Sequence, residues 1–294
     1  MKSKSKETVV RTLCLIVSFS SLGVLAGIVM ILFLEGLPIF RVASIGEFLL
    51  GSEWYPSYHP PDYGALPLIL ASLFVTAIAM GIAIPVGIGS AIFMACVMPR
   101  RARTVVKPTI ELLAGVPSVI YGLFGMRIMG PWIQELFGLP TGLTALTAGV
   151  MLGIMALPTI VSMSDDAISA ISNEYRDASL ALGSTHLEAI VRAVLPISLS
   201  GIITSVILGM SRAIGETMTV LMVAGGAAVI PTTIFGPVRP MTATIAGEMG
   251  QTAVGSNHYH ALFAIAIILF FITLIFNVIA DQTTERFKGR VGSQ

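Results

Sequence analysis

The chain has 294 residues, of which 17 are basic, 16 are acidic and 55% are hydrophobic. Charged residues make up 11% of the chain, whereas a soluble domain contains about 25%, so the polar surface is too small for a water-soluble globule of this size. This composition excludes an ordinary cytosolic enzyme and an intrinsically disordered chain, and the net charge of +1 gives no support for nucleic-acid binding.

The first predicted membrane span is the uncharged run of 23 residues from Thr12 to Leu34, long enough to cross a hydrocarbon core of about 30 Å as a helix. Lys2, Lys4 and Lys6 give the chain the basic start of a signal peptide. However, the apolar run exceeds the core of a signal peptide, about 7–15 residues, and no small-x-small cleavage site follows it. We therefore expect an uncleaved transmembrane helix.

Five further spans are predicted, so the fold class is an all-α membrane protein with six transmembrane helices. The second span continues past Pro85 as a bent or interfacial segment through Met98, because the uncharged run there is longer than one span. Residues 35–63 and 225–260 are expected to form outer segments, the latter rich in Gly, Pro and Thr and partly re-entrant. Spans two to six are predicted at Leu66–Gly87, Leu112–Gly130, Thr141–Ser162, Leu199–Ala224 and Ala261–Ala280.

The GVPS element at residues 115–118 interrupts the third predicted span. Glycine and proline there free backbone polar groups at membrane depth, which is tolerated only where protein or a water-filled cavity satisfies them. Ser118 and Tyr121 are therefore candidate lining residues of a substrate pathway. A helix break that serves only packing is an equally good explanation.

Lysine and arginine concentrate in the connections on one side of the predicted bundle. Thirteen of them fall on this side, against Arg41 and Arg239 on the other. Because cytoplasmic loops carry an excess of positive charge, we expect both termini to be cytoplasmic. The thirteen are Lys2, Lys4, Lys6, Arg11, Arg100, Arg101, Arg103, Lys107, Arg176, Arg192, Arg286, Lys288 and Arg290.

The chain lacks the common nucleotide-binding and catalytic motifs. A P-loop places a glycine directly before its lysine, and none of the five lysines follows a glycine. The H-E-x-x-H, C-x-x-C and G-x-S-x-G patterns are also absent. His258 and His260 fall in the outer segment, where the alternatives are a metal site and a solvated loop. We expect no enzymatic activity, no metal and no cofactor in this chain.

The predicted cytoplasmic connection contains the sequence EYRDASLALGSTHLEAIVRAVLP at residues 174–196. It resembles the EAA loop of ABC-transporter permeases, in which E-A-A is followed after three residues by G and after nine more by I-x-L-P. Asp177, Ser179 and Ala193 depart from this pattern, but its spacing is kept. The matching positions are Asp177, Ala178, Ser179, Gly183, Leu195 and Pro196.

The same stretch also predicts local structure. Residues 173–182 suit a short helix with early acidic residues, Gly183 suits a turn, and residues 187–194 suit a second helix. A short exposed amphipathic helix fits a groove on a partner protein, while an ordinary helical hairpin is the alternative. In the family this loop docks into the ATPase subunit, so the resemblance implies an ATPase-docking role for the six matching positions.

Further segments resemble the PstC-type permeases of phosphate ABC transporters over about residues 35–281. The partner permease, PstA, shares the G-x-PS element, but the WYP sequence and the long 225–260 segment fit the PstC type better. Pro240 stands where threonine is expected. The segments are FLLGSEWYP (48–56), YGALPLI (63–69), IELLAGVPSVIYG (110–122), SRAIGETM (211–218) and GPVRPMTATIAGEMG (236–250).

The resemblance implies a type I ABC importer permease (MetI-like) fold. Residues 1–65 would hold an N-terminal tail, the first span and an outer loop, residues 66–281 the transmembrane domain, and residues 282–294 a cytoplasmic tail. The implied function is that of a permease subunit of an ATP-driven phosphate importer in the inner (plasma) membrane of a prokaryote. The implied partners are a dimer of ATP-binding subunits that carries the ATP and Mg, a second, PstA-like permease, a periplasmic or lipid-anchored phosphate-binding protein, and membrane lipid.

Two charges lie inside the fifth predicted span, where each costs about 3 kcal/mol on insertion scales. Arg212 and Glu216 are four residues apart, so on a continuous helix they share a face and are close enough to pair. The guanidinium of Arg212 offers forked donors to an oxyanion. Glu216 would orient and partly neutralise it, so that phosphate passes rather than stays bound. A purely structural ion pair is the alternative.

Other positions have a less specific expectation. Arg127 is expected to extend its charge to the membrane surface, and Arg239 either to meet a substrate-delivering protein or to be a solvated loop charge. Glu111 is expected to cap the third helix. The small-residue pairs Gly23/Gly27 and Gly149/Gly153 allow close helix approach and are expected to serve packing.

Three other functions remain open from the sequence. A permease for another oxyanion, sulfate or molybdate, shares the composition and the EAA loop. A membrane scaffold could signal phosphate status without moving phosphate. A secondary transporter is a third candidate. The EAA spacing and the scarcity of acidic residues for proton relay within the spans argue against it.

Overall fold

The computed structural model describes residues 2–291, with side chains over residues 10–172, 174–279 and 282. Apart from a two-stranded antiparallel hairpin, in which Trp54 pairs with Tyr63, the regular elements of these residues are helical. The first half contains α1 (Lys2–Gly36), a 3₁₀ turn (Leu37–Arg41), α2 (Ile45–Leu50), β1 (Trp54–Tyr55), β2 (Asp62–Tyr63), α3 (Leu66–Ile92), a π turn (Phe93–Val97), α4 (Arg100–Ala114), α5 (Ser118–Phe124), a π turn (Gly125–Met129) and α6 (Gly130–Phe137). The second half contains α7 (Ala145–Ser169), α8 (Asn173–Ala181), α9 (His186–Ala189), a π turn (Ile190–Val194), α10 (Leu195–Ile214), α11 (Met218–Val223), α12 (Met241–Glu248), a 3₁₀ turn (Met249–Gln251) and α13 (Asn257–Val291).

Five helical segments of the described residues are long and apolar enough to span a bilayer, and a sixth results if one bent helix pair forms a single span. The first, second, fourth and sixth predicted spans are confirmed in α1, α3, α7 and α13. The second continues to Val97 through Pro85, as expected. The predicted all-α membrane architecture is therefore confirmed, apart from the short hairpin.

The third predicted span is wrong because the chain does not continue there as one straight helix. The chain is helical in α4, breaks, and resumes in α5 at 90° to its previous direction. The break falls at the GVPS element because Pro117 offers no N–H and disfavours helical backbone at Val116 before it. Ser118 then becomes the first residue of α5.

The fifth predicted span is displaced toward the N-terminus. The helical segment runs from His186 to Ile214, because a π turn directly before α10 accommodates Pro196 at its second position without ending the helix. At the other end, Gly215 terminates α10, and α11 starts at Met218 as a separate helix.

The core of the bundle lies between α3, α7, α10 and α11. Glycines let these helices approach closely: a Cβ on Gly87 in α3 would lie 2.7 Å from Cγ2 of Ile160 in α7, and a Cβ on Gly209 in α10 would lie 2.6 Å from Cγ1 of the same residue. Gly153 of the predicted small-residue pair likewise faces the backbone of α3. Gly23 in α1 has no such neighbour within the described chain.

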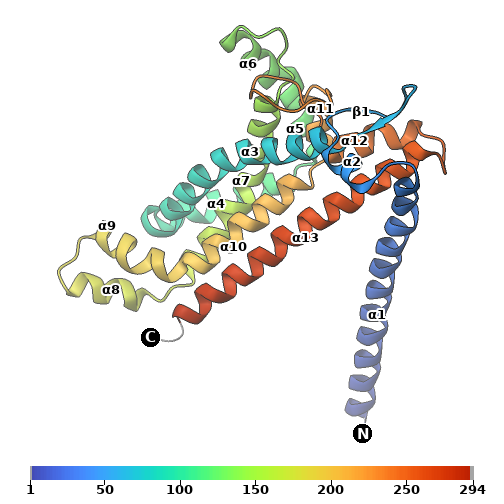
Figure 1. The fold of residues 1–294 in the computed structure, drawn as a ribbon. Coiled ribbons are helices and arrows are strands. Elements are labelled where there is room, and N and C mark those ends of the chain that lie inside the picture. The colour runs from blue at the N-terminus through green and yellow to red at the C-terminus, as the bar shows by residue number, and fades with distance from the viewer. Residues whose placement is uncertain (1, 292–294) are drawn as a thin grey trace.

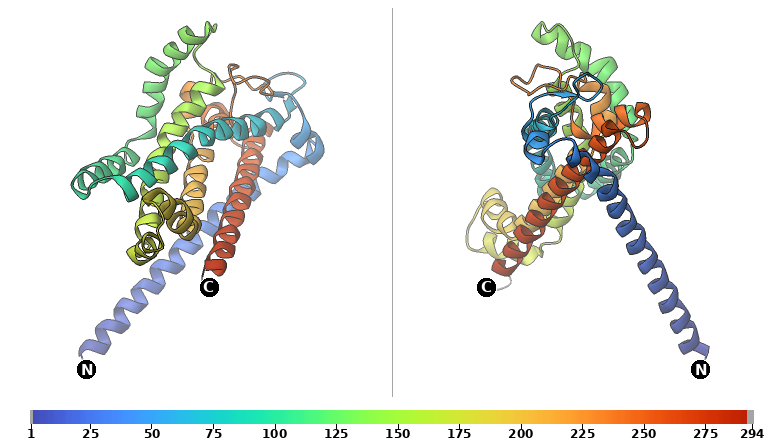
Figure 2. Two further views of the ribbon diagram at one scale, coloured as in Figure 1. Left: turned by 90° about the vertical axis from the view of Figure 1, so that its left-hand side faces the viewer. Right: turned by 45° about the vertical axis from the view of Figure 1, so that its right-hand side comes forward.

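Helix α1 packs against α13 only near one end, where Gly36 meets Ile267, and then diverges from the bundle (Figures 1 and 2). Its other end lies on the same side of the molecule as the end of α13 and as α8 and α9 (Figure 1). We call residues 174–196, which include α8 and α9 and were predicted to dock an ATPase, the docking loop, and we call this side the docking-loop end. We call the opposite end, with β1, α6 and α12, the hairpin end. Both chain ends thus share one side, as six spans require. The basic residues of the topology prediction whose side chains lie outside the described residues are Lys2, Lys4, Lys6, Arg286, Lys288 and Arg290.

A second apolar cluster closes the hairpin end. It joins Phe48 of α2 and Trp54 of β1 to Met241 of α12 and Leu262 of α13, all fully or nearly fully buried. This cluster fixes the predicted outer loop, the 225–260 segment and the start of α13 to one another.

Candidate functional site

Two helix breaks lie against each other, one between α4 and α5 and the other between α10 and α11. Nη2 of Arg212, in the last turn of α10, donates to the carbonyl oxygen of Ala114, at the end of α4, over 3.0 Å. The hydroxyl of Thr219 in α11 donates to the carbonyl oxygen of Ser118 over 3.1 Å. Arg212 thus satisfies a carbonyl that the end of α4 frees, and Thr219 adds a second bond from α11 to the first residue of α5.

Small residues bring the helices after these breaks together. A Cβ on Gly122 in α5 would lie 2.6 Å from Sδ of Met222 in α11. A Cβ on Gly125 would lie 2.8 Å from both Cγ of Met151 and Cγ1 of Val223. Larger side chains at either glycine would therefore push α5 away from α11. Gly122 and Gly125 thus determine how closely the helix after the break approaches α11.

The predicted pairing of Arg212 with Glu216 is wrong. The helix that would place them on one face ends at Ile214, so the spacing of four residues no longer aligns them. Oε1 of Glu216 accepts the backbone N–H of Thr219 over 3.0 Å, and the backbone oxygen of Glu216 accepts the hydroxyl of Thr242 over 2.7 Å. Glu216 therefore caps α11 and ties it to α12.

Arg212 consequently carries a charge with no carboxylate within ion-pair distance among the described residues. Its side chain is exposed. The half-buried Tyr121 lies at the same break and donates its hydroxyl to the carbonyl oxygen of Leu113 over 2.9 Å. The structure thus gathers Arg212, Ser118 and Tyr121 around one break, and their role in a substrate pathway stays a prediction.

The docking loop, residues 174–196, folds as predicted into the short helix α8, a turn at Gly183 and a second helix that starts with α9. This second helix continues through the π turn into α10. Ser172 caps α8, Gly183 takes the left-handed φ of 89° that turns the chain, and Thr185 with Glu188 forms a capping box at α9. A hydroxyl bond of 2.7 Å between Ser179 and Ser184 closes the hairpin. Serine at the second alanine position of the EAA pattern therefore has a structural reason.

The docking loop presents unpaired apolar and polar side chains. Leu182 and Leu187 are 90% and 73% exposed, and Asp177, Ala178, Gly183 and Pro196 are exposed as well. Ser179 and Leu195 are half-buried, so they shape the loop from inside. Apolar residues this exposed on a short helical hairpin are typical of a protein contact surface.

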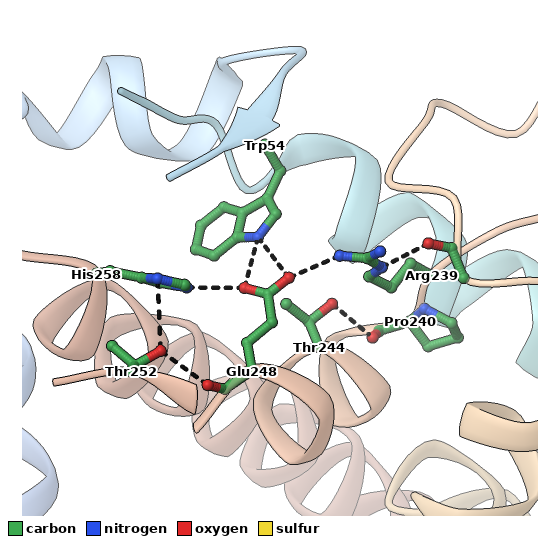
Figure 3. Close-up of polar contacts among 8 residues, drawn as sticks. Trp54, Arg239, Pro240, Thr244, Glu248, Thr252 and His258 are labelled. Carbon is green, nitrogen blue, oxygen red and sulfur yellow. Dashed lines mark hydrogen bonds and ion pairs between the residues drawn. The ribbon is translucent and has the colours of Figure 1, made fainter. Parts of the chain in front are cut away.

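A carboxylate that the sequence did not single out organises the hairpin end. Glu248, at the end of α12, accepts Nε1–H of Trp54 over 3.1 Å, pairs with Nη1 of Arg239 over 2.6 Å, and contacts Nε2 of His258 over 2.8 Å (Figure 3). The hydroxyl of Thr252 donates to its backbone oxygen over 2.7 Å. The available signal was an acidic residue within the otherwise uncharged MTATIAGEMG stretch.

A pocket of about 590 Å³ opens beside this cluster and includes Tyr58, Arg239, Glu248 and His258 in its wall. Nε of Arg239 donates to the carbonyl of Gly226 over 2.7 Å, which leaves Nη2 without a partner among the described residues. Arg239 is half-buried and ion-paired, so the interpretation of a solvated loop charge is wrong.

Two of the remaining predictions have a clear outcome. Glu111 lies inside α4 rather than at its start and accepts the hydroxyl of Ser162 over 3.0 Å, so it does not cap a helix. Arg127 is exposed on the π turn after α5, in agreement with a charge extended away from the bundle. His258 and His260 contact different groups, since Nδ1 of His260 lies 2.7 Å from the backbone oxygen of Glu35.

The sequence matches a family of transporters. The family described as "Binding-protein-dependent transport system inner membrane component" matches residues 83–291. The probable ABC transporter permease protein YqgH of Bacillus subtilis is 36% identical over 86% of this chain and 83% of its own length. The phosphate transport system permease protein PstC of Mesorhizobium japonicum is 36% identical over 84% and 80%, and PstC 1 of Mycobacterium tuberculosis is 32% identical over 86% and 85%.

Solved ABC transporters share the fold. A chain of the MetNI methionine ABC transporter in an inward-facing conformation superposes with a TM-score of 0.57 at 17% identity, covering 74% of this chain and 93% of that one. A chain of a bacterial alginate ABC transporter, in complex with an alginate pentasaccharide-bound periplasmic protein, gives 0.60 at 14% identity over 90% and 94%. The predicted type I ABC importer permease fold is therefore confirmed.

Proposed function

This chain belongs to the family of binding-protein-dependent transport system inner membrane components, and from that premise we propose that it is a permease subunit of an ATP-driven importer of inorganic phosphate. PstC phosphate permeases are 32–36% identical to it over most of its length. The structural observation that carries the proposal is Arg212, an exposed guanidinium with no carboxylate partner at the junction of two helix breaks. Arginine forks match the oxygens of phosphate in geometry and charge.

The substrate pathway runs between this chain and a second, PstA-like permease. Helix breaks at membrane depth are where membrane transporters place polar binding groups. Val119, Ile120 and Leu123 on α5 are exposed, so this face suits contact with another membrane subunit. Ser118 and Tyr121 lie at the same break that Arg212 contacts and complete the polar lining.

Energy comes from a separate dimer of ATP-binding subunits, which holds the ATP and Mg and binds at the docking loop. This chain has no P-loop and acts as a transport subunit, not as an enzyme. The exposed side chains of Leu182 and Leu187 supply the apolar contact, while Gly183 and the serine pair in the hairpin keep the loop in shape. Closure of the ATPase dimer moves the docking loop and, through α10, the break at Arg212.

A periplasmic or lipid-anchored phosphate-binding protein delivers the substrate at the hairpin end. The pocket beside Glu248 provides an entrance, because Nη2 of Arg239 is uncommitted and both carboxylate oxygens of Glu248 already have partners. An anion in this pocket would meet a free donor and a neutralised carboxylate.

The chain lies in the inner membrane with both termini and the docking loop in the cytoplasm. The excess of lysine and arginine in the connections of one side supports this orientation. We also propose the division of the chain into an N-terminal part (residues 1–65), a transmembrane domain (residues 66–281) and a C-terminal tail (residues 282–294). Helix α1 belongs to the N-terminal part and is largely separate from the bundle.

Two other functions share part of these features. A sulfate or molybdate permease would use the same guanidinium chemistry, and a phosphate-signalling scaffold would keep the docking loop without transport. The uncompensated charge of Arg212 at paired helix breaks favours transport over signalling, since a scaffold gains nothing from a route for anions.

Uptake of competing oxyanions tests the substrate. Proteoliposomes with this chain, its partner permease and its ATPase, with ATP inside and the cognate binding protein outside, receive labelled phosphate, sulfate or molybdate in turn. We expect phosphate to accumulate and the other two anions to stay outside. Accumulation of sulfate or molybdate in place of phosphate would show that the substrate assignment is wrong.

A further inference from the structure

A cavity of about 340 Å³ lies at the docking-loop end, between the end of α3, the start of α4, the end of α7 and α8. Arg100, Arg103 and Arg176 line it together with polar and sulfur-containing side chains that include Ser169 and Cys96, and its lining contains no aspartate or glutamate. Three guanidinium groups in one partly enclosed space repel one another, so the cavity favours a negatively charged occupant.

Most donors of these arginines are free. The guanidinium of Arg100 forms no hydrogen bond or ion pair with the described residues, and that of Arg176 has one long contact, 3.4 Å to Nδ1 of His186. Arg103 uses only Nη2, which donates to Asp165 over 2.8 Å and to Ser169 over 2.5 Å. The cavity therefore faces several N–H groups that no protein acceptor satisfies.

The nearby carboxylates neutralise only the part of this charge that Arg103 carries. Asp165 is fully buried and lies 2.8 Å from Nη2 of Arg103 and 3.1 Å from Nζ of Lys107. Asp166 pairs with the same lysine. Both carboxylates lie outside the lining of the cavity and are held by Arg103 and Lys107 of α4, so the charges of Arg100 and Arg176 remain unbalanced.

We propose that this cavity binds a phosphate-type oxyanion, supplied either by free orthophosphate or by the headgroup of an anionic lipid. Arginine forks bind phosphate oxygens in pairs, and the cavity has room for one such group with water. It lies at the end of the span formed by α3, where basic pockets between membrane helices take lipid headgroups. Under the proposed function this end is cytoplasmic.

The bound anion would connect two elements that are otherwise joined weakly. Arg100 belongs to α4, whereas Arg176 belongs to α8 in the docking loop. An oxyanion between them links the docking loop to the membrane bundle, so its occupancy would stiffen the contact through which the ATPase acts. The site is separate from the pathway at Arg212.

Alkylation of Cys96 reports occupancy directly, because this thiol lines the cavity and Cys14 is the chain's only other cysteine. The complete transporter carrying Cys14→Ser is placed in phosphatidylcholine nanodiscs and treated with N-ethylmaleimide in phosphate or in chloride of equal ionic strength. We expect about tenfold slower labelling at phosphate tenfold above its dissociation constant, since only the empty fraction reacts. Arg100→Gln should abolish the protection, and Arg101→Gln, the adjacent arginine outside the cavity, should retain it.

Nanodiscs containing phosphatidylglycerol separate the two sources. Slow labelling in these discs without free phosphate, restored to the fast rate by Arg100→Gln, assigns the occupant to a lipid headgroup. Equal labelling rates in phosphate, chloride and both lipids would overturn the proposal, as would equal protection in Arg100→Gln. Protection that appears only when the ATPase subunit is present would assign the cavity to that partner and also overturn it. None of these readouts requires transport, so failure of phosphate import leaves this test unaffected.

Discussion

The guanidinium of Arg212 holds two helix breaks together through the carbonyl of Ala114 and has further donors for a ligand. An arginine that is exposed within a permease and lacks a carboxylate partner is stabilised by water or by the substrate. Its charge is therefore available in the resting state, without the neutralisation that a partner at Glu216 would bring. Under the proposed function, water and the second permease balance the attraction of phosphate against its release.

Substitution of Arg212 should separate charge from geometry. We expect Arg212→Gln to lower phosphate uptake by at least about tenfold, because loss of one charge-assisted hydrogen bond costs about 1.5–3 kcal/mol. Arg212→Lys keeps the charge without the forked donors, so its phosphate uptake should lie between that of Arg212→Gln and that of the unmodified chain. Uptake into proteoliposomes at equal amounts of assembled complex measures this.

Arg127 supplies the matched control for Arg212. It is exposed on the turn after α5, and its guanidinium has no hydrogen bond to the described residues. Arg127→Gln should transport as the unmodified chain does. Equal loss of uptake in both variants would contradict a specific role for Arg212.

Glu216 acts as a hydrogen-bond acceptor at the start of α11, so the acceptor matters more than the charge. We expect Glu216→Ala to raise the exchange rate of the Thr219 amide about fivefold, since a lost helix cap costs about 1 kcal/mol. Glu216→Gln keeps an acceptor oxygen and should exchange at nearly the original rate. Hydrogen exchange of peptides covering α11 distinguishes these variants, and equal acceleration in both would mean that the charge itself is required.

Glu248 holds the hairpin end through three side-chain donors. We expect Glu248→Gln to accelerate hydrogen exchange across residues 225–240 by about tenfold, because the charge-assisted bonds to Arg239 and His258 weaken. Glu135→Gln, on the exposed face of α6 at the same end, should change nothing. Unchanged exchange in Glu248→Gln would show that the apolar cluster alone fixes this segment.

At the scale of elements, glycine contacts decide which helices approach one another. Gly87 and Gly89 are two residues apart on α3, but a Cβ at Gly87 meets Ile160 whereas a Cβ at Gly89 meets no atom within 4 Å. We expect Gly87→Ala to lower the melting temperature of the purified complex, because overpacking costs about 1–3 kcal/mol. Gly89→Ala should raise it or leave it unchanged, since alanine favours helix by about 1 kcal/mol over glycine. The reverse order would contradict the packing of α3 on α7.

The sequence allowed the spans to be predicted well and the breaks only in part. Hydropathy locates α3, α7 and α13 because lipid selects against charge over a whole helix. The end of α10 was missed because a single Gly215 inside an apolar run does not by itself stop a helix. The prediction that Arg212 pairs with Glu216 was wrong because it assumed a continuous helix through both residues.

The contacts of Glu248 could not be predicted from the sequence, for a different reason. Trp54, Glu248 and His258 come from three elements and Arg239 comes from the loop before α12, and only tertiary packing brings them together. In contrast, the docking loop was predictable in detail, because capping residues and Gly183 act over a few neighbours.

At the scale of the whole molecule, α8 and α9 of the docking loop lie at the opposite end of the bundle from α12, which ends at Glu248 (Figure 1). Along the chain, the break between α4 and α5 precedes the docking loop. The break between α10 and α11 lies between the docking loop and Glu248, and α10 runs from the docking loop directly to this break. Motion of the docking loop therefore reaches Arg212 through one helix. The separate course of α1 leaves one side of the bundle open to another membrane subunit.

The most direct test of import is phosphate accumulation with and without internal ATP. Right-side-out vesicles that hold the complete transporter receive labelled phosphate and the binding protein outside. We predict accumulation above the external concentration only when ATP is inside. Accumulation without ATP would contradict the account and indicate a secondary transporter, and ATP hydrolysis without phosphate entry would contradict it and indicate a signalling scaffold.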